Sequence, residues 1–133
     1  MGDDEIRQKY LELQIGAEQM KQMHSQLQAV EAKSQELELN IRNLESIKGS
    51  NNAAMLAPVA EGIFLRAELK SDAEVIVNAG AGVCVKKTIG EAAGILKEKK
   101  AELNQYAREL SIELEMASEG MRKLEEELNS MIK

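Results

Sequence analysis

Residues 88–133 read TIGEAAGILKEKKAELNQYARELSIELEMASEGMRKLEEELNSMIK, and this stretch decides the fold class. Apolar residues recur along it at alternating steps of four and three, with one polar exception. The positions are Ile89, Ala93, Leu96, Lys100, Leu103, Ala107, Leu110, Leu114, Ala117, Met121, Leu124, Leu128 and Met131. A 3.5-residue repeat held this long is typical of a narrow seam against another helix. Thr88 and Glu91 fit a capping box, which predicts that the helix begins there.

The first third of the chain, residues 1–48, has a similar pattern and no proline. Its apolar positions are Ile6, Tyr10, Leu13, Ala17 and Met20, followed by Leu27, Val30, Ser34, Leu37, Ile41 and Leu44. The phase slips between Met20 and Val30, where either Met23 or His24 could carry the seam. The slip has the form of a stammer, which overwinds a coiled coil locally.

Residues 1–48 and 88–133 flank one insert and are similar in length, so they can fold back as antiparallel partners. Apolar residues then meet in most layers, for example Leu27 with Leu110. Ser34 opposite Leu103 and Leu37 opposite Lys100 are the weak layers. A parallel homodimer is the competing arrangement, which the insert disfavours.

The insert, residues 49–87, contains the single proline and short runs with strand periodicity. Ile63–Leu69, the segment around Val75–Val77 and Val83–Lys86 alternate as strands do, and a fourth short strand, 55–57, is expected to stop at Pro58. So few strands cannot bury a core of their own. We therefore expect an oligomer interface formed by the apolar face of this segment. Its residues are Ile63, Leu65, Ala67, Leu69, Val75, Val77, Val83 and Val85.

Composition narrows the class of protein. Charged residues make up 30% of the chain, aromatic residues 2%, and the net charge is −6. The acidic balance disfavours nucleic acid as a partner. No apolar run is long enough for a membrane span, and the acidic N-terminus lacks the features of a secretory signal. We therefore expect a cytoplasmic protein.

No group of residues suggests catalysis, a cofactor or a metal. Residues 80–82 (Gly-Ala-Gly) are followed by a strand rather than a helix, so a hairpin turn is favoured over a nucleotide loop. Cys84 and His24 lack partner groups, and Cys84 is expected to be a buried strand residue. The run 125–127 (Glu-Glu-Glu) is expected to be a solvated helix face. The functional alternatives are repulsion that keeps coiled-coil ends apart, or contact with basic segments. The chain is predicted not to be an enzyme.

The chain resembles prefoldin, and specifically its alpha class of archaeal type, over essentially its whole length. The most specific stretches are 56–59 (LAPV), 62–69 (GIFLRAEL), 75–83 (VIVNAGAGV) and 85–92 (VKKTIGEA). The fold class implied is mainly α, a long antiparallel two-helix coiled coil with two inserted β-hairpins that assemble into an oligomeric β-barrel.

The resemblance also implies a function and partners. The implied assembly is a hexamer of two alpha-like and four beta-like subunits. It would act as an ATP-independent holdase that binds non-native polypeptides and delivers them to a group II chaperonin. The distal ends of the coiled coil would contact the client, and here the matching residues are Ile6, Tyr10, Leu11, Leu13, Leu124, Leu128, Met131 and Ile132. The alternative function is that of a structural coiled-coil or filament-forming relative of prefoldin.

Overall fold

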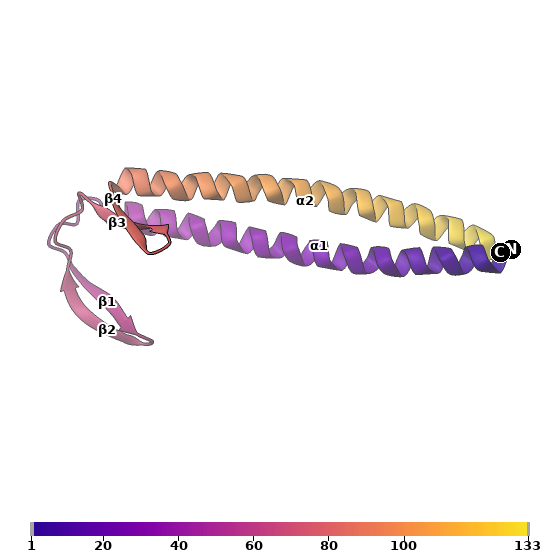
Figure 1. Ribbon diagram of the computed structural model, residues 1–133, viewed down its shortest axis with the longest axis horizontal. Helices are drawn as coiled ribbons and strands as arrows, with labels where there is room; N and C mark the ends of the chain where they lie inside the picture. The colour runs from indigo at the N-terminus through magenta and orange to yellow at the C-terminus, as the bar shows by residue number, and fades with distance from the viewer. Residues whose placement is uncertain (1, 133) are drawn as a thin grey trace. The chain divides into compact units, whose positions relative to one another are not determined.

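A computed structural model describes residues 2–132 and confirms the predicted fold class (Figure 1). The elements in chain order are α1 (Gly2–Glu45), β1 (Ala54–Ala60), β2 (Ile63–Glu68), β3 (Val75–Gly80), β4 (Val83–Lys87) and α2 (Ile89–Ile132). The strands form two separate antiparallel hairpins, β1–β2 and β3–β4.

The chain forms two compact units. The helical unit comprises the described parts of Met1–Ser34 and Glu102–Lys133, and the hairpin unit is Gln35–Ala101. Both helices contribute to each unit.

In the helical unit, α1 and α2 run antiparallel. The Lys9 ammonium donates to Glu127 Oε2 at 2.7 Å, so the start of α1 lies beside the end of α2. The Ser34 hydroxyl donates to Asn104 Oδ1 at 2.7 Å, so later α1 residues lie beside earlier α2 residues. The antiparallel arrangement within one chain is therefore confirmed. The weak layer expected at Ser34 is instead satisfied by a polar partner.

The predicted phase slip in α1 is wrong. Tyr10 and Ala17 are exposed, whereas Lys9 and Gly16 are half-buried. The half-buried positions of α1 up to Val30 are 6, 9, 13, 16, 20, 23, 27 and 30. These alternate steps of three and four without a break, so α1 has no stammer. Of the two residues proposed for the seam at the slip, Met23 lies in the seam and His24 is exposed.

A close contact explains why a glycine lies in this seam. A Cβ atom placed on Gly16 would lie 3.2 Å from Met121 Sδ, which is tighter than ordinary van der Waals contact. The flexible Met121 side chain thus fills the space that Gly16 leaves. Lys9 fits the seam for another reason, because its aliphatic stem packs while its ammonium reaches Glu127.

In the hairpin unit the seam is more fully buried. Leu37, Ile41, Ile89, Ala92 and Ala93 are all at most 6% exposed. The second weak layer is also satisfied, since the Lys100 ammonium donates to Glu38 Oε2 at 2.7 Å. This hydrogen bond is the main cause that lowers the pKa of Glu38 below its ordinary value.

Helix α2 begins at the predicted capping box. Thr88 Oγ1 accepts from the Glu91 amide at 3.0 Å, and Glu91 Oε1 accepts from the Thr88 amide at 3.1 Å. The hydrogen bond from the Thr88 backbone lowers the pKa of Glu91. A lowered pKa means that this contribution to stability is complete above the ordinary glutamate pKa. It is lost as the pH falls from there through the lowered value.

Removing the cap should measurably weaken the protein. We expect Thr88→Ala to lower the free energy of unfolding by about 1 kcal/mol, because the Glu91 amide loses its acceptor. Thr88→Ser keeps a hydroxyl and should restore most of the loss. Urea denaturation followed by circular dichroism measures both variants. Equal stability of the Ala and Ser variants would rule out the hydroxyl as the cause.

The expected end of the first strand at Pro58 is also wrong. Strand β1 does not stop at Pro58, which lies opposite Phe64, but continues to Ala60 with a register shift between 58 and 60. Pro58 lacks an amide hydrogen, which a two-stranded hairpin tolerates because each strand has a free edge. Gly62, with φ of 72°, allows the tight turn into β2.

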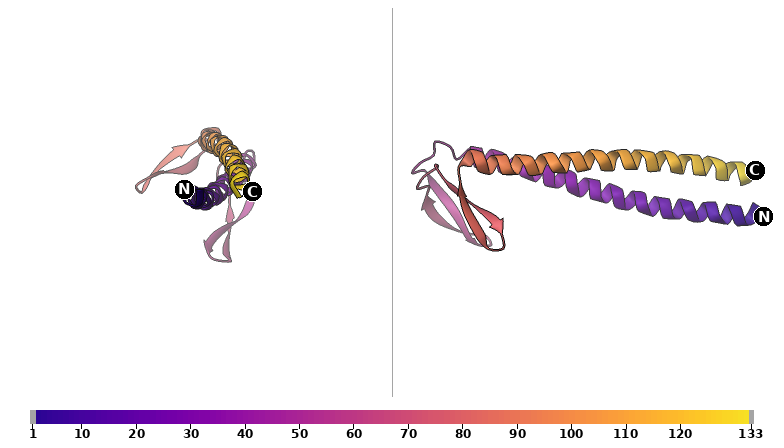
Figure 2. Two further views of the ribbon diagram at one scale, coloured as in Figure 1. Left: turned by 90° about the vertical axis from the view of Figure 1, so that its right-hand side faces the viewer. Right: turned by 45° about the horizontal axis from the view of Figure 1, so that its top comes forward.

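Hairpin β3–β4 has the turn that the Gly-Ala-Gly run predicted. Val77 pairs with Val85 and Asn78 with Cys84. Ala81 and Gly82 have φ of 52° and 76°, as a two-residue type I′ turn requires. Within the hairpin unit β4 leads directly into the start of α2, and the two hairpins project separately (Figures 1 and 2).

Candidate functional site

The residues predicted to contact a client all lie in the helical unit, and they differ in exposure. Tyr10, Leu11 and Ile132 are 49%, 56% and 56% exposed. The other five lie in or beside the seam. Of these, Ile6, Leu13, Leu124 and Met131 are half-buried and Leu128 is buried. Antiparallel pairing brings the start of α1 and the end of α2 to the same end of this unit (Figure 1).

Four exposed apolar residues in the described part of the helical unit were not predicted from the sequence, and one of them, Tyr106, is 45% exposed. Ile15 is 50% exposed, Ile112 57% and Met116 69%. Ile15 follows Leu11 by four residues, and Met116 follows Ile112 by four, so each pair shares one helix face. Both pairs lie off the seam. The sequence did contain a signal for these residues, because they are apolar although the 3.5-residue repeat does not require them to be.

Ile112 and Met116 belong to a surface hollow on α2, which we call the α2 patch. It has a volume of about 440 Å³ and is lined by Ile112, Glu115, Met116, Glu119, Gly120 and Lys123. A Cβ atom on Gly120 would meet nothing within 4 Å, so packing does not require a glycine there. Glycine inside a helix costs about 1 kcal/mol relative to alanine. The residue is therefore unfavourable for helix stability, and its lack of a side chain keeps the hollow open.

Arg122 forms two ion pairs beside the α2 patch. The Arg122 guanidinium contacts Glu119, and its Nη1 donates to Glu126 Oε1 at 2.6 Å. The hydrogen bond from Arg122 lowers the pKa of Glu119, so this carboxylate is charged at neutral pH. Arg122 is thus paired with both glutamates, and Glu115 and Lys123 also line the patch.

Charge is distributed unevenly between the two units. The described residues of the helical unit contain 14 acidic and 7 basic side chains, whereas the hairpin unit contains nine of each. The negative charge of the chain therefore comes from the helical unit, where the exposed apolar side chains Tyr10, Leu11, Ile15, Tyr106, Ile112, Met116 and Ile132 also lie.

The residues predicted to form the oligomer interface lie on both hairpins. Ile63, Leu65 and Val83 are between 56% and 58% exposed, and Val85 is 37% exposed. The remaining four are half-buried: Ala67, Leu69, Val75 and Val77. Val75 and Val77 line a groove of about 230 Å³ in the hairpin unit, together with Leu44, Ile76, Ala92, Ile95, Leu96 and Lys99.

Both faces of the hairpins carry apolar side chains. Leu56, Phe64 and Ile76 are 62%, 54% and 71% exposed, and strand alternation had assigned Phe64 and Ile76 to the opposite face from the predicted interface. Each hairpin has two strands, so each strand also has an unpaired edge. Such edges and faces bind other strands or aggregate unless a partner covers them.

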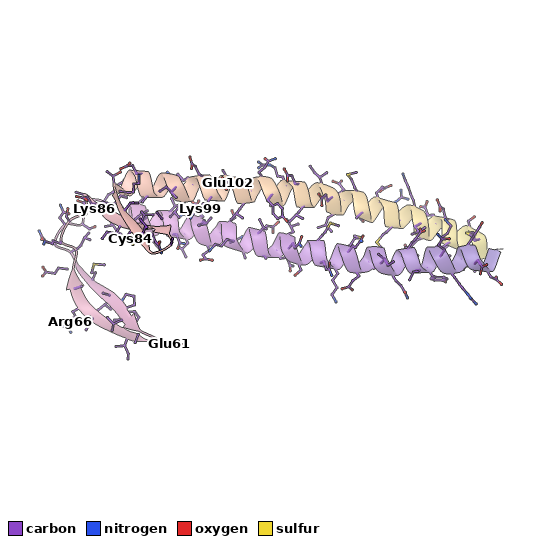
Figure 3. The ribbon with its side chains drawn as sticks, viewed as in Figure 1. Glu61, Arg66, Cys84, Lys86, Lys99 and Glu102 are labelled. Atoms are coloured by element: carbon purple, nitrogen blue, oxygen red, sulfur yellow. The ribbon has the colours of Figure 1, made fainter. Side chains whose placement is uncertain are left out.

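The expectation that Cys84 is buried is wrong for the chain by itself. Cys84 is exposed on β4, opposite Asn78. Asn78, its partner across the hairpin, is exposed as well. Figure 3 shows Cys84 and Lys86 on this hairpin, and Glu61 and Arg66 on the other.

Two features are absent from the described residues. Between residues 2 and 132, no group of three or more His, Cys, Asp or Glu side chains could hold a metal ion. Neither α1 nor α2 has an apolar stretch of the length and hydropathy that crossing a membrane requires.

Comparisons with known proteins agree with the architecture. The family model described as "Prefoldin subunit" matches residues 17–133. A prefoldin subunit alpha from Methanosarcina barkeri is 30% identical over 98% of this chain and 94% of its own length. One from Thermofilum pendens is 25% identical over 92% and 93%.

A solved structure titled as filamentous PFD from Methanocaldococcus jannaschii has a TM-score of 0.75 and 16% identity. It covers 86% of this chain and 95% of its own. At this identity the likeness concerns the fold. Since the family model spans most of the chain, and the relatives match it nearly end to end, this chain belongs to the prefoldin family, with similarity to the archaeal alpha subunits.

Proposed function

We propose that this chain is the alpha-type subunit of an ATP-independent holdase, which binds non-native polypeptides and delivers them to a group II chaperonin. It acts in the cytoplasm as part of a hexamer with two alpha-type and four beta-type subunits. The family is one of chaperones rather than enzymes, and the chain needs no cofactor for the proposed role.

One observation carries the proposal: the helical unit has exposed apolar side chains that its own packing does not use. Other residues fill every position of the seam, so Tyr10, Leu11 and Ile132 are not needed for helix pairing. These three side chains remain about half exposed. Exposed apolar side chains in water are unfavourable unless another surface covers them. A non-native polypeptide, which exposes its own apolar residues, is a suitable partner.

Weak contacts suit this role. Each end of a coiled coil can cover only a small apolar area, so a single contact should have a dissociation constant of about 1 mM. Several subunits contacting one client raise the overall affinity by roughly 10²–10⁴-fold through effective concentration. Release then needs no nucleotide, since each contact opens quickly.

The seam residues have a different part in the proposal. Ile6, Leu13, Leu124, Leu128 and Met131 hold the two helix ends together, and they reach a client when those ends fray. The relatives named as prefoldin subunit alpha support assembly with sister subunits. The hairpins supply the apolar faces and free edges for that assembly.

The second candidate is a filament-forming structural protein. It is favoured by one finding, the fold-level likeness to a chain titled as filamentous PFD. Negative-stain images of the purified chain, with and without a beta-type subunit, separate the two functions. Discrete particles that require the beta-type subunit support the holdase, and filaments of this chain alone support the structural alternative.

The holdase proposal predicts a specific loss of activity. In the assembled hexamer, the triple variant Tyr10→Ser, Leu11→Ser, Ile132→Ser should lose most of its ability to suppress aggregation of a chemically denatured protein, measured by light scattering. We expect roughly fivefold more variant to be needed, because several weak contacts are lost together.

Leu39→Ser is the matched control for this experiment. Leu39 is 57% exposed and lies on α1 in the hairpin unit, so its loss should change neither scattering nor assembly. Native mass spectrometry verifies that each variant still forms the hexamer. Full suppression by an intact triple-variant hexamer would refute a role for these side chains in client binding.

A further inference from the structure

The α2 patch combines three features that the seam does not explain. Ile112 and Met116 present apolar surface on one outer face of α2. Gly120 leaves the hollow beside them open, with nothing within 4 Å of the space a Cβ atom would take. Glu115, Glu119 and Lys123 complete the lining. The patch belongs to the part of α2 between the ends of the helix, so it is distinct from the terminal residues considered above.

The negative charge of the helical unit limits which kind of molecule can bind at the α2 patch. The helical unit has twice as many acidic as basic side chains, and Arg122 beside the patch is engaged by Glu119 and Glu126. A second copy of this chain would bring a similarly acidic surface, which disfavours docking of patch on patch. Nucleic acid is disfavoured for the same reason. A segment with both apolar and cationic side chains fits the apolar hollow and the acidic balance of the unit that holds it.

We propose that the α2 patch is a second client site, selective for unfolded segments in which Lys or Arg residues flank apolar ones. The apolar side chains of the segment cover Ile112 and Met116, and its cations lie near Glu115 in this predominantly acidic unit. This inference rests on the proposed function, because it names the class of polypeptide that the holdase prefers. It adds a site and a selectivity that burial of apolar surface alone does not provide.

The experiment compares two unfolded probes of similar size and opposite charge. Reduced, alkylated lysozyme is the basic probe, and reduced, alkylated α-lactalbumin is the acidic probe. Each is labelled with a fluorophore and titrated with the assembled hexamer, and fluorescence anisotropy gives the dissociation constant. Salt at about 50 mM and about 300 mM tests the electrostatic part, since the Debye length falls across this range.

The hexamer of wild-type chain should bind the basic probe about tenfold more tightly than the acidic one at low salt, and about twofold more tightly at high salt. Ile112→Ser with Met116→Ser should weaken binding of the basic probe about threefold. Glu115→Gln with Glu119→Gln should reduce the preference for the basic probe to about threefold without weakening the acidic one, because it removes charge and little apolar area.

Matched controls use residues of the hairpin unit. Leu39→Ser removes a side chain with the same 57% exposure as Ile112, and Glu98→Gln removes an exposed carboxylate from α2. Neither should change the affinity for either probe. Native mass spectrometry tests whether the patch variants keep the mass of the hexamer.

The outcomes separate the two proposals. Equal affinity for both probes, or a preference for the basic probe that the four patch substitutions leave intact, overturns the α2 patch as a client site while the holdase stands. A change in assembly mass, with unchanged probe binding, assigns the patch to contacts between subunits and also overturns it. Failure of the wild-type hexamer to bind either probe would instead overturn the proposed function.

Discussion

Replacing Leu65 with glutamate should abolish assembly with a beta-type subunit while the helices remain folded. Leu65 is 57% exposed on β2 and pairs with Ala57 across the hairpin, on the apolar face predicted to meet other subunits. A carboxylate buried there without a partner would cost several kcal/mol, on the order of the free energy that holds such an interface together. Native mass spectrometry of the mixed subunits should show the hexamer peak lost.

Arg66→Glu is the matched control, because it places the same carboxylate one residue further along β2, on the opposite face. It should retain most of the hexamer. Circular dichroism of the Leu65→Glu chain should show its helical signal kept, since α1 and α2 do not depend on that face of the hairpin. A Leu65→Glu chain that assembles as well as the control would contradict the assignment of the interface.

Leu110→Ala should lower the free energy of unfolding by about 2–3 kcal/mol, the second largest effect we expect. Leu110 is only 4% exposed, in the seam of the helical unit. Alanine favours the helix as well as leucine does, so the loss reports packing rather than helix propensity. The lower part of the usual range applies, because neighbouring seam residues are only half-buried and can close part of the space.

Leu39→Ala makes the same chemical change at an exposed position of α1 and should cost less than about 0.5 kcal/mol. Both variants are compared by guanidinium denaturation at one protein concentration, because assembly adds a concentration-dependent contribution to stability. A Leu110→Ala effect no larger than that of Leu39→Ala would mean that Leu110 does not pack in the seam.

Much of the fold could be predicted from particular residues. The thirteen seam positions proposed between Ile89 and Met131 are all buried or half-buried. The capping box at Thr88 and the turn at Gly82 form as their local chemistry requires. These features depend on neighbours along the chain, so a one-dimensional pattern contains the information that they need.

Other features depended on partners distant in the sequence. Lys9 and Gly16 were poor seam candidates by residue type, yet Glu127 satisfies the first and Met121 fills the space beside the second. Pro58 was expected to end a strand, and a free strand edge lets it continue. Cys84 was expected to be buried, but it is exposed on β4, as is its partner Asn78.

The residues of the candidate client surface also differ in how far the sequence could identify them. Tyr10, Leu11 and Ile132 could be named from their position near the ends of the helices, and the structure leaves them exposed. Ile112 and Met116 lie within a helix, and the sequence distinguishes them only as apolar residues outside the 3.5-residue repeat. The structure shows that both side chains are exposed and that a hollow lies beside Gly120.

By itself, the amino-acid sequence determined that this protein has two long helices around a β segment, where α2 begins and which face of α2 packs. Heptad spacing, a helix cap and a glycine turn act over a few residues, and so they can be identified without a partner. Only the tertiary structure decided which of two adjacent α1 residues faces α2 and which apolar side chains stay exposed. Those outcomes depend on the shape and charge of the side chain opposite, which the periodicity of one helix does not contain.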